Sequence, residues 1–355
     1  MNTHSCGAVL AAILLAAGPA AAAEGGEPAA GFGGDVEFLK QHTDAFVLGT
    51  GPDRIVVVPQ FQGRVMTSTA DGDGGYSIGW INRKLVASGK LDKHINAFGG
   101  EDRFWLGPEG GQFGIFFAPG KDFTFEDWQT PAPIDSEPYH IAAKDERSAV
   151  FQHAFDVTNQ SGTRFRVGVE RTVRLLERAD AAEILGDLPE TVKLVAYETR
   201  NNVTNRGRQP WKQETGLLSI WILGMYNPAP NTTVVIPFKA GAEADLGPKV
   251  NDAYFGKIPP ERLVVRDNIL FFSADGKQRG KLGISPKRAL GTAGSYDADH
   301  GVLTIVTYNQ PDEYVGYVNS MWEKQAEPFS GDAINSYNDG QVSPDTPPLG
   351  PFYEI

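Results

Sequence analysis

The segment from Phe98 to Gln112 concentrates the residue types that recognise sugars. Its sequence, FGGEDRFWLGPEGGQ, has paired glycines towards both ends, and paired glycines allow close backbone approach. Between them lie the residues suited to binding: Glu101, Asp102, Arg103, Trp105 and Glu109. An arginine offers a planar set of donors to hydroxyl groups, and a tryptophan offers a flat apolar face with one N–H. The segment predicts a binding site. The alternative is a structural turn with an ion pair between Arg103 and Glu101 or Glu109.

A second polar and aromatic stretch lies near the C-terminus, between Tyr314 and Gly340. It is rich in Asn, Asp, Tyr and Trp and poor in aliphatic residues. Loops of this composition on a rigid scaffold commonly carry ligand-binding side chains. The side chains that we expect to contact a ligand here are Trp322, Asn335, Tyr337 and Asp339. The alternative is that the Asn and Asp residues of this stretch only form turns.

Metal and cofactor chemistry has little support in the sequence. Asp332 and Asp339 would offer oxygen ligands to Ca²⁺, but their spacing does not match the D-x-[DN]-x-[DN]-G loop. The histidines beyond residue 23 are never within four residues of one another, so they offer no metal-binding pair, and only His94 adjoins a candidate site. Phosphate-binding glycine loops and the G-x-S-x-G motif are absent. We predict neither a metal nor a cofactor.

Short alternating runs of apolar and polar residues dominate the chain after residue 34. This pattern, with 41 Gly and 24 Pro to supply turns, predicts strands rather than helices. The expected strands are residues 45–48, 54–58, 64–69, 113–117, 149–157, 164–175, 192–203, 217–223, 232–236, 262–265, 269–272, 281–284 and 302–308. Short helices are expected over Asp35–Gln41 and Gly316–Ala326. Without an internal repeat, the simplest architecture is one all-β antiparallel sandwich over residues 35–355.

The first 23 residues have the features of a signal peptide. They contain no Asp, Glu, Lys or Arg, and an apolar run at Ala8–Ala17 precedes a cleavage-like Ala21–Ala23. We predict that residues 1–23 are removed and pack against nothing, and that residues 24–34 are a linker. Removal of Cys6 would leave a chain without cysteine. The expected location is periplasmic or secreted.

The charge balance excludes some partners. The chain carries 32 Lys and Arg against 44 Asp and Glu, a net charge of −12, and it has no basic cluster. Phosphate backbones and anionic lipid headgroups repel such a chain. We therefore expect neither nucleic acid nor, after signal cleavage, a membrane as a partner, and we expect a mono- or oligosaccharide as the ligand.

Four segments together resemble the DUF6786-like family of secreted bacterial proteins, within the galactose mutarotase-like and aldose 1-epimerase-like superfamily. These segments are residues 99–112, 318–323, 335–340 and 349–354. The resemblance covers residues 35–355 and implies a β-supersandwich with a sugar-binding cleft on a concave sheet. The last segment is typical of a strand, and the family continues beyond it, so the resemblance also implies that the chain is C-terminally incomplete.

The resemblance further implies roles for individual residues. In the epimerases a glutamate is the general base at the anomeric hydroxyl and a histidine is the general acid at the ring oxygen. Glu354 is similar to that base, and Gly99, Gly100 and Arg103 are similar to a segment that holds the sugar. The place of the histidine reads Leu217–Trp221. An indole N–H does not donate a proton at working pH, so this sequence departs from the epimerase pattern.

Three functions stay open. Carbohydrate binding would use stacking and hydroxyl-binding side chains, namely Trp105, Trp322, Tyr337, Arg103, Glu101, Asp102, Asn335 and Asp339. An epimerase-like enzyme would use Glu354 as base and Glu109 or His94 as acid. A scaffold without a small-molecule ligand is the third. For the first two we expect the Gly99–Gln112 segment, residues 319–340 and Glu354 to meet at one cleft, with Arg103 holding a carboxylate by two hydrogen bonds.

Overall fold

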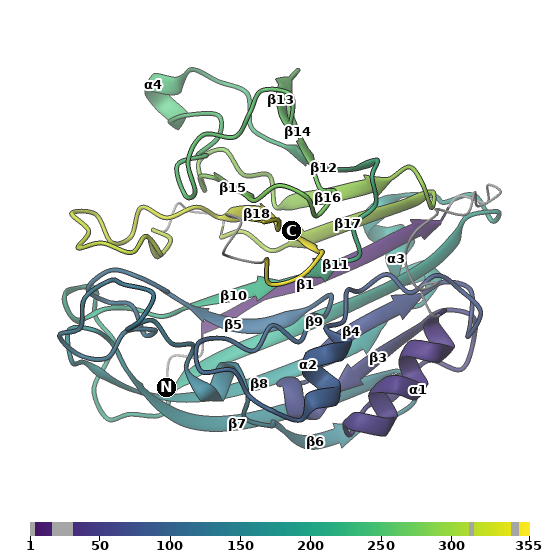
Figure 1. Ribbon diagram of the computed structural model, residues 1–355, viewed down its shortest axis with the longest axis horizontal. Coiled ribbons are helices and arrows are strands. Elements are labelled where there is room, and N and C mark those ends of the chain that lie inside the picture. The colour runs from purple at the N-terminus through teal and green to yellow at the C-terminus, as the bar shows by residue number, and fades with distance from the viewer. Residues whose placement is uncertain (1–3, 16–30, 312–315, 342–347) are drawn as a thin grey trace.

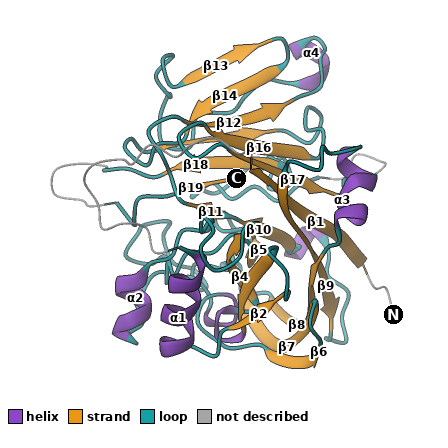
Figure 2. Ribbon diagram, turned by 90° about the vertical axis from the view of Figure 1, so that its right-hand side faces the viewer, coloured by secondary structure: helices purple, strands orange, loops and turns teal. Residues whose placement is uncertain are grey.

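A computed structural model describes residues 4–15, 31–311, 316–341 and 348–355 of the chain. Strands far outnumber helices, and every named strand pair is antiparallel. Figures 1 and 2 show the strands gathered into one body, with helices only at its margins. The predicted all-β antiparallel fold is confirmed. None of the helices in the described ranges is long and apolar enough to cross a membrane.

The largest sheet has ten strands and forms the back of the molecule in Figure 1. In spatial order they are β13 (Leu263–Arg266), β14 (Ile269–Ser273), β12 (Thr232–Pro237), β16 (Thr292–Asp297), β17 (Val302–Tyr308), β1 (His4–Leu15), β9 (Lys193–Asn205), β8 (Arg164–Leu175), β7 (Ser148–Thr158) and β6 (His140–Lys144). Alternation explains several of these strands, because Phe165, Val167 and Val169 of β8 are buried while Arg164, Arg166 and Glu170 are exposed.

Three smaller sheets pack against the large one. One pairs β5 (Arg103–Gly107) with β10 (Ser219–Leu223), and another orders β2 (Phe46–Leu48), β3 (Arg54–Val58) and β4 (Arg64–Thr69). The last orders β11 (Met225–Tyr226), β19 (Tyr353–Glu354), β18 (Ile334–Asn338) and β15 (Gly280–Ile284). One apolar core joins the layers, since Phe104 of β5 and Leu282 of β15 belong to the same buried cluster as Val167 of β8.

The helices cover edges of this sandwich. They are α1 (Phe32–His42), α2 (Arg83–Ser88), α3 (Arg178–Leu185) and α4 (Glu243–Leu246), with single 3₁₀ turns at Pro59–Phe61, Ala132–Ile134 and Gln213–Thr215. Phe32 and Leu39 of α1 and Val86 of α2 pack with Val56 and Met66 on the outer side of the β2–β4 sheet. The predicted helix over Asp35–Gln41 lies within α1, which begins at Phe32 inside the segment expected to be a linker.

Two predicted elements are wrong, and each has a physical reason. Residues 316–326 contain no helix; their polar groups bond to another loop instead, with Ser320 Oγ accepting from the Glu109 N–H and the Gln325 N–H donating to Gln112. Residues 113–117 form no strand, and only Phe117 makes an isolated bridge, to Trp128. Their apolar side chains are buried in the core without a neighbouring strand to pair with.

The N-terminal segment also differs from expectation. We predicted that residues 1–23 pack against nothing, yet β1 (His4–Leu15) pairs with β9 on one side and with β17 on the other. The apolar run is too short to span a membrane. At twelve residues, β1 is nevertheless long enough to be a central strand, because its backbone N–H and C=O groups pair with the strands on both sides. Residues 16–30, which include the predicted cleavage site, lie outside the described residues.

Candidate functional site

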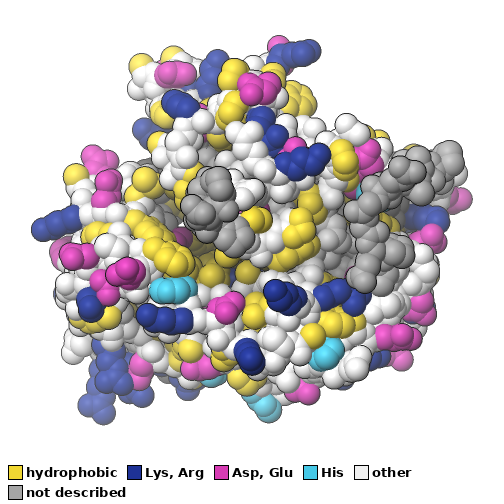
Figure 3. Space-filling view, viewed as in Figure 1, with side chains coloured by type: hydrophobic (Ala, Val, Ile, Leu, Met, Phe, Trp, Pro, Cys, Tyr) yellow, Lys and Arg dark blue, Asp and Glu magenta, His cyan; other side chains and the backbone are white. Residues whose placement is uncertain are grey.

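A cavity of about 210 Å³ opens between the small sheets and the upper half of the large sheet. Its wall combines strand β10 (including Trp221), strands β15, β18 and β19 (including Lys281, Asn335, Tyr337 and Glu354), strand β17 (including Tyr308), and loop residues such as Tyr254, Tyr317 and Asp332. Figure 3 shows apolar side chains in a band across the middle of the face that Figure 1 presents. Aromatic and polar side chains thus line one cavity.

Glycines let the elements approach closely beside the cavity. Gly99 and Gly100 have φ values of +93° and +108°, which L side chains rarely adopt. A Cβ on Gly224, which joins β10 to β11, would lie 2.6 Å from the Glu101 carbonyl oxygen. The predicted Gly-Gly turn therefore brings Glu101 and Asp102 to the cavity wall, against the strand that carries Trp221.

Glu354 is the carboxyl group best placed for chemistry. It sits on β19, which pairs with β18 and β11, so its backbone is fixed on both sides. Burial raises the pKa of Glu354 to about 7, against the lowering effect of the Lys281 and Arg103 charges. Its side chain lines the cavity and is half-buried. A carboxyl group with this pKa exchanges a proton readily near neutral pH.

Lys281 brings a positive charge into the cavity. It lies on β15 directly across from Tyr337 of β18. Its ammonium nitrogen is 5.1 Å from the ring centroid of Trp221 and 4.8 Å from that of Tyr254. Its charge lowers the pKa values of Glu109, Asp332 and Glu354, each of which burial raises. The ammonium is thus the common counter-charge of three carboxyl groups.

Two further carboxyl groups are held by fixed donors. Asp332 accepts from the Tyr254 hydroxyl at 2.6 Å and from the Asn251 amide at 2.9 Å. Glu109 accepts from the Trp322 indole N–H at 2.9 Å. These bonds orient each carboxylate. Asp332 lines the cavity, where an oriented carboxylate can accept from ligand hydroxyls, whereas Glu109, the predicted acid, lies outside the cavity lining.

Glu101 and Asp102 line the cavity but are tied to the core. Glu101 accepts from the Ser68 N–H at 2.6 Å, and burial raises the pKa of Glu101 to about 7. Asp102 binds the Arg171 guanidinium and accepts from Thr199 Oγ1 at 3.0 Å. Their carboxylates have internal partners, so they support the wall more than they offer free acceptors.

Asn335 and Trp221 offer groups to a ligand. Asn335 Oδ1 is buried and has no hydrogen-bond partner among the described residues, and Asn335 lines the cavity. A buried carbonyl oxygen without a donor is costly unless a ligand or water supplies one. Trp221 stacks on Trp105 with ring centroids 5.8 Å apart, so its ring is held rigidly in the wall. Tyr337, also in the wall, donates to Asp339 at 2.5 Å.

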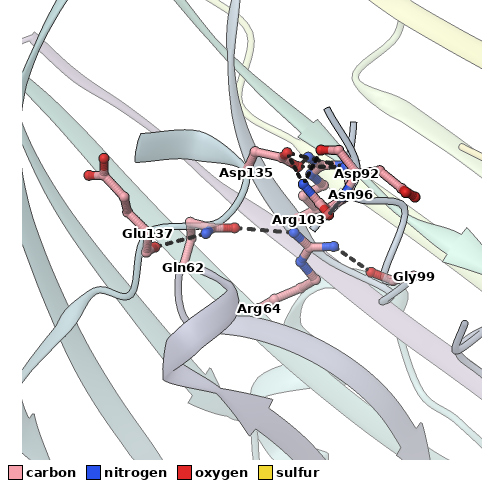
Figure 4. A network of polar contacts seen from close by, with 8 residues as sticks. All are labelled: Gln62, Arg64, Asp92, Asn96, Gly99, Arg103, Asp135 and Glu137. Atoms are coloured by element: carbon pink, nitrogen blue, oxygen red, sulfur yellow. Dashed lines mark hydrogen bonds and ion pairs between the residues drawn. The ribbon is translucent and has the colours of Figure 1, made fainter. Parts of the chain in front are cut away.

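Arg103 lies away from the cavity surface, in contrast to its expected sugar contact. Its side chain is fully buried and donates to Asp135 at 2.7 Å through one nitrogen, without a second bond to that carboxylate. Figure 4 shows this pair beside Asn96, with Arg64 nearby donating to the Gly99 carbonyl oxygen. Burial lowers the pKa of Arg103. The arginine holds loops together, and its charge reaches Glu354 only through space.

Other predicted residues lie outside the cavity lining. Trp105 is buried between Trp221 and Phe116. His94 Nδ1 donates to the Trp128 carbonyl oxygen, 2.6 Å away, and its ring packs on Phe125. Trp322 is 36% exposed and stacks on Trp128. Asp339 is buried and accepts a hydrogen bond from the Tyr337 hydroxyl. Of the predicted residues, the structure brings Glu101, Asp102, Asn335, Tyr337 and Glu354 together at the cavity.

A metal site does not emerge from the described residues. Across residues 4–15, 31–311, 316–341 and 348–355, no group of three or more His, Cys, Asp or Glu side chains is placed to hold a metal ion. Asp332 and Asp339 are the two residues that the sequence offers as calcium ligands. Their carboxylates accept hydrogen bonds from the hydroxyl groups of Tyr254 and Tyr337 respectively.

Sequence reasoning missed Lys281, Tyr254 and the exposure of Trp221 to the cavity. Lys281 lies in a short strand, GKLGI, whose other residues are apolar or glycine. The alternation of that strand is the only feature of the sequence that could have indicated which way the Lys281 side chain points. For Trp221 the sequence predicts only a place in the strand over residues 217–223. The register of β10 on β5, with Trp221 across from Trp105, is what places its ring in the wall.

Comparison with known proteins identifies the family. Residues 30–355 match the model of the "Family of unknown function (DUF6786)", and the chain belongs to this family. The predicted resemblance to it is confirmed. Comparison with curated proteins gave no match.

Two solved structures are similar at low identity. One is a galactose mutarotase-like protein from Lactobacillus casei ATCC 334, with 9% identity and a TM-score of 0.46, covering 82% of this chain and 94% of that one. The other is a candidate aldose 1-epimerase from Escherichia coli K12, with 11% identity and a TM-score of 0.44, covering 87% of this chain and 96% of that one. These likenesses are too distant to bring either protein's activity to this chain.

Proposed function

We propose that this protein binds a carbohydrate in the cavity between β10, β15, β18 and β19. One observation carries the proposal: a carboxyl group with a pKa of about 7, Glu354, lines a hollow walled by aromatic rings and held polar groups. Sugars present apolar C–H faces and hydroxyl edges, and both find partners here. Trp221 supplies the flat face, while Glu354, Lys281 and Asn335 supply hydrogen-bonding groups.

A second candidate function, acid–base chemistry at an anomeric carbon, is favoured by the pKa of Glu354. A carboxyl group near neutrality takes up and releases a proton at working pH. Glu109, the predicted acid, has a raised pKa, and its charge raises that of Glu354. Binding without turnover and binding with turnover are separated by polarimetry of a bound reducing sugar, because only the second accelerates the change of optical rotation.

Calorimetric titration with a panel of mono- and oligosaccharides tests the binding proposal. For a sugar that binds, Trp221→Ala and Glu354→Gln should each weaken binding about tenfold or more, because each removes a contact inside the cavity. The matched controls are Trp211→Ala and Glu323→Gln, which change the same residue types outside the cavity lining and away from Glu109. A panel without any binding, or binding that the controls weaken as much as the cavity variants, would refute the proposal.

We also propose that the protein is exported. Support comes from the uncharged apolar N-terminus and the Ala21–Ala23 sequence that follows it. N-terminal sequencing of material recovered outside the cytoplasm tests this. A chain that starts near Glu24 is expected, and a chain that still starts at Met1 would contradict it.

A further inference from the structure

An arginine lies at the rim of the cavity, outside its lining but beside the lining residue Tyr337, and no carboxylate of the described residues forms an ion pair with it. Arg279 immediately precedes β15, and its guanidinium carbon is 3.7 Å from the ring centroid of Phe255 and 6.0 Å from that of Tyr337. Phe255 is 49% exposed, although it is a large apolar side chain. The two rings meet edge to face with centroids 5.8 Å apart. The cation therefore lies over the exposed Phe255 ring, with the buried Tyr337 ring beside it.

The described residues give Arg279 no hydrogen-bonded partner. Its Nε is buried and unpartnered, and no ion pair joins it to a carboxylate of the described ranges. Asp339, which follows the Asn338–Gly280 pair, accepts instead from the Tyr337 hydroxyl and the Gly350 N–H. Asp275 is taken by Arg262 through two hydrogen bonds. The guanidinium thus keeps its donors available.

Chain connectivity places Arg279 close to the cavity. Arg279 comes two residues before Lys281, so the Cα atoms of the two residues are at most about 7 Å apart. Lys281 lies across from Tyr337, and Tyr337 lines the cavity while also contacting the Phe255 ring. A ligand that extended from the cavity past Tyr337 would come within reach of the guanidinium, which is 6.0 Å from the Tyr337 ring centroid.

The two cations of this face differ in their surroundings. Lys281 is balanced by Glu109, Asp332 and Glu354. Arg279 lies beside the Phe255 and Tyr337 rings and forms no ion pair with a carboxylate of the described residues. A planar guanidinium binds an oxyanion through two parallel hydrogen bonds. The interior therefore suits an uncharged sugar ring, and the rim suits a negatively charged substituent.

We propose that the ligand is an acidic saccharide whose oxyanion, a uronate carboxylate or a sulfate ester, binds Arg279 at the rim. This inference rests on the proposed carbohydrate binding and specifies the class of ligand. The sugar that carries the oxyanion contacts the exposed part of the Phe255 ring, and the adjoining sugar enters the cavity beside Trp221.

Calorimetry with matched pairs of oligosaccharides tests the inference. The probes are glucuronate-, galacturonate- and mannuronate-containing oligosaccharides, each as the free acid and as the neutral methyl ester, together with sulfated galactose oligosaccharides and their unsulfated forms. The charged member of a pair should bind about tenfold more tightly, as expected for charge-assisted hydrogen bonds. The uronate and sulfate arms tell which oxyanion is held.

Variants assign the preference to one side chain. Arg279→Lys keeps the charge but loses the planar donors, so most of the charged-over-neutral ratio should disappear while the neutral member binds as before. Arg279→Met should remove the ratio completely. Arg266→Met takes a charge from the exposed end of β13 and should leave the ratio unchanged. Thermal unfolding of each variant verifies that the fold is intact.

The possible failures are distinct. Neutral members that bind as well as charged ones, with sensitivity to Trp221→Ala, would overturn the acidic-ligand inference and leave carbohydrate binding standing. A charged preference that survives in both Arg279 variants would also overturn it. An absence of binding by every probe would overturn the proposed function together with this inference.

Discussion

At the scale of single residues, the protonation of Glu354 is set by opposing effects. Burial raises its pKa to about 7, and Lys281 is the largest effect in the opposite direction. Lys281→Met should therefore raise the pKa of Glu354 further, because a stabilising positive charge is lost while burial remains. Carbon-13 NMR titration of the glutamate carboxyls measures this. Lys277→Met, an exposed change near the same strand, is the control and should leave the titration unchanged. An unchanged or lowered pKa in Lys281→Met would contradict the electrostatic account.

Glu101 makes a separate prediction about stability and pH. Its pKa is raised to about 7 in the folded protein, above the ordinary value of 4.5 that applies to the unfolded chain. Between these values the folded state holds a proton that the unfolded state has released, so stability from this group falls as pH rises. Glu101→Gln cannot titrate. Relative to this variant, the wild-type free energy of unfolding should fall between pH 5 and 8, by an amount on the order of 3 kcal/mol. Urea unfolding at several pH values measures the difference, and a constant difference would refute it.

At the scale of elements, β5 shows both what the sequence indicates and what it hides. Residues 99–112 were predicted to be functional because they gather charges, and Glu101 and Asp102 do reach the cavity. The same composition hides a buried strand, since Arg103 is at 0% exposure and Trp105 is in the core. A segment with a buried ion pair and a segment that binds a ligand can have the same sequence pattern, because both place charged residues next to aromatic ones.

The Arg103–Asp135 pair is expected to carry stability rather than ligand contact. Asp135→Asn should destabilise the fold by about 3 kcal/mol or more, because it leaves two buried arginines, Arg103 and Arg64, without their shared counter-charge. The control is Asp127→Asn, which breaks a surface pair with Lys121 and should cost at most about 1 kcal/mol. Equilibrium denaturation measures both. Equal effects of the two substitutions would contradict the assignment.

The N-terminal strand gives a further test at this scale. Export would remove β1 and leave the facing sides of β9 and β17 without the partner they have in the full chain. In protein lacking residues 1–23, the amides of β9 and β17 that bond to β1 in the full chain should exchange hydrogen faster. Amides shared by β7 and β8 serve as the internal control. Unchanged protection along β9 would show that β1 does not pair there in solution.

At the scale of the whole molecule, the strands were largely predictable and the site was partly so. Alternation located β3, β4 and β8 to the residue, because each buries one face or both with β-branched and aromatic side chains. The alternation pattern did not predict β18, because its sequence, INSYN, is polar and typical of a loop. Pairing with β15 and β19 makes these residues a strand. Pairing over long sequence distances also explains why Lys281 could not be predicted: only the register across from Tyr337 brings it into the cavity.

The cavity is the central claim, and a crystal structure with the tightest-binding saccharide of the panel tests it most directly. The account predicts a sugar ring against Trp221, with a hydroxyl group in hydrogen-bond contact with Glu354. A second part of the ligand should leave the cavity beside Tyr337. A saccharide bound elsewhere on the surface, for example in the groove around Trp211 and Arg208, with the cavity free of ligand, would contradict the account.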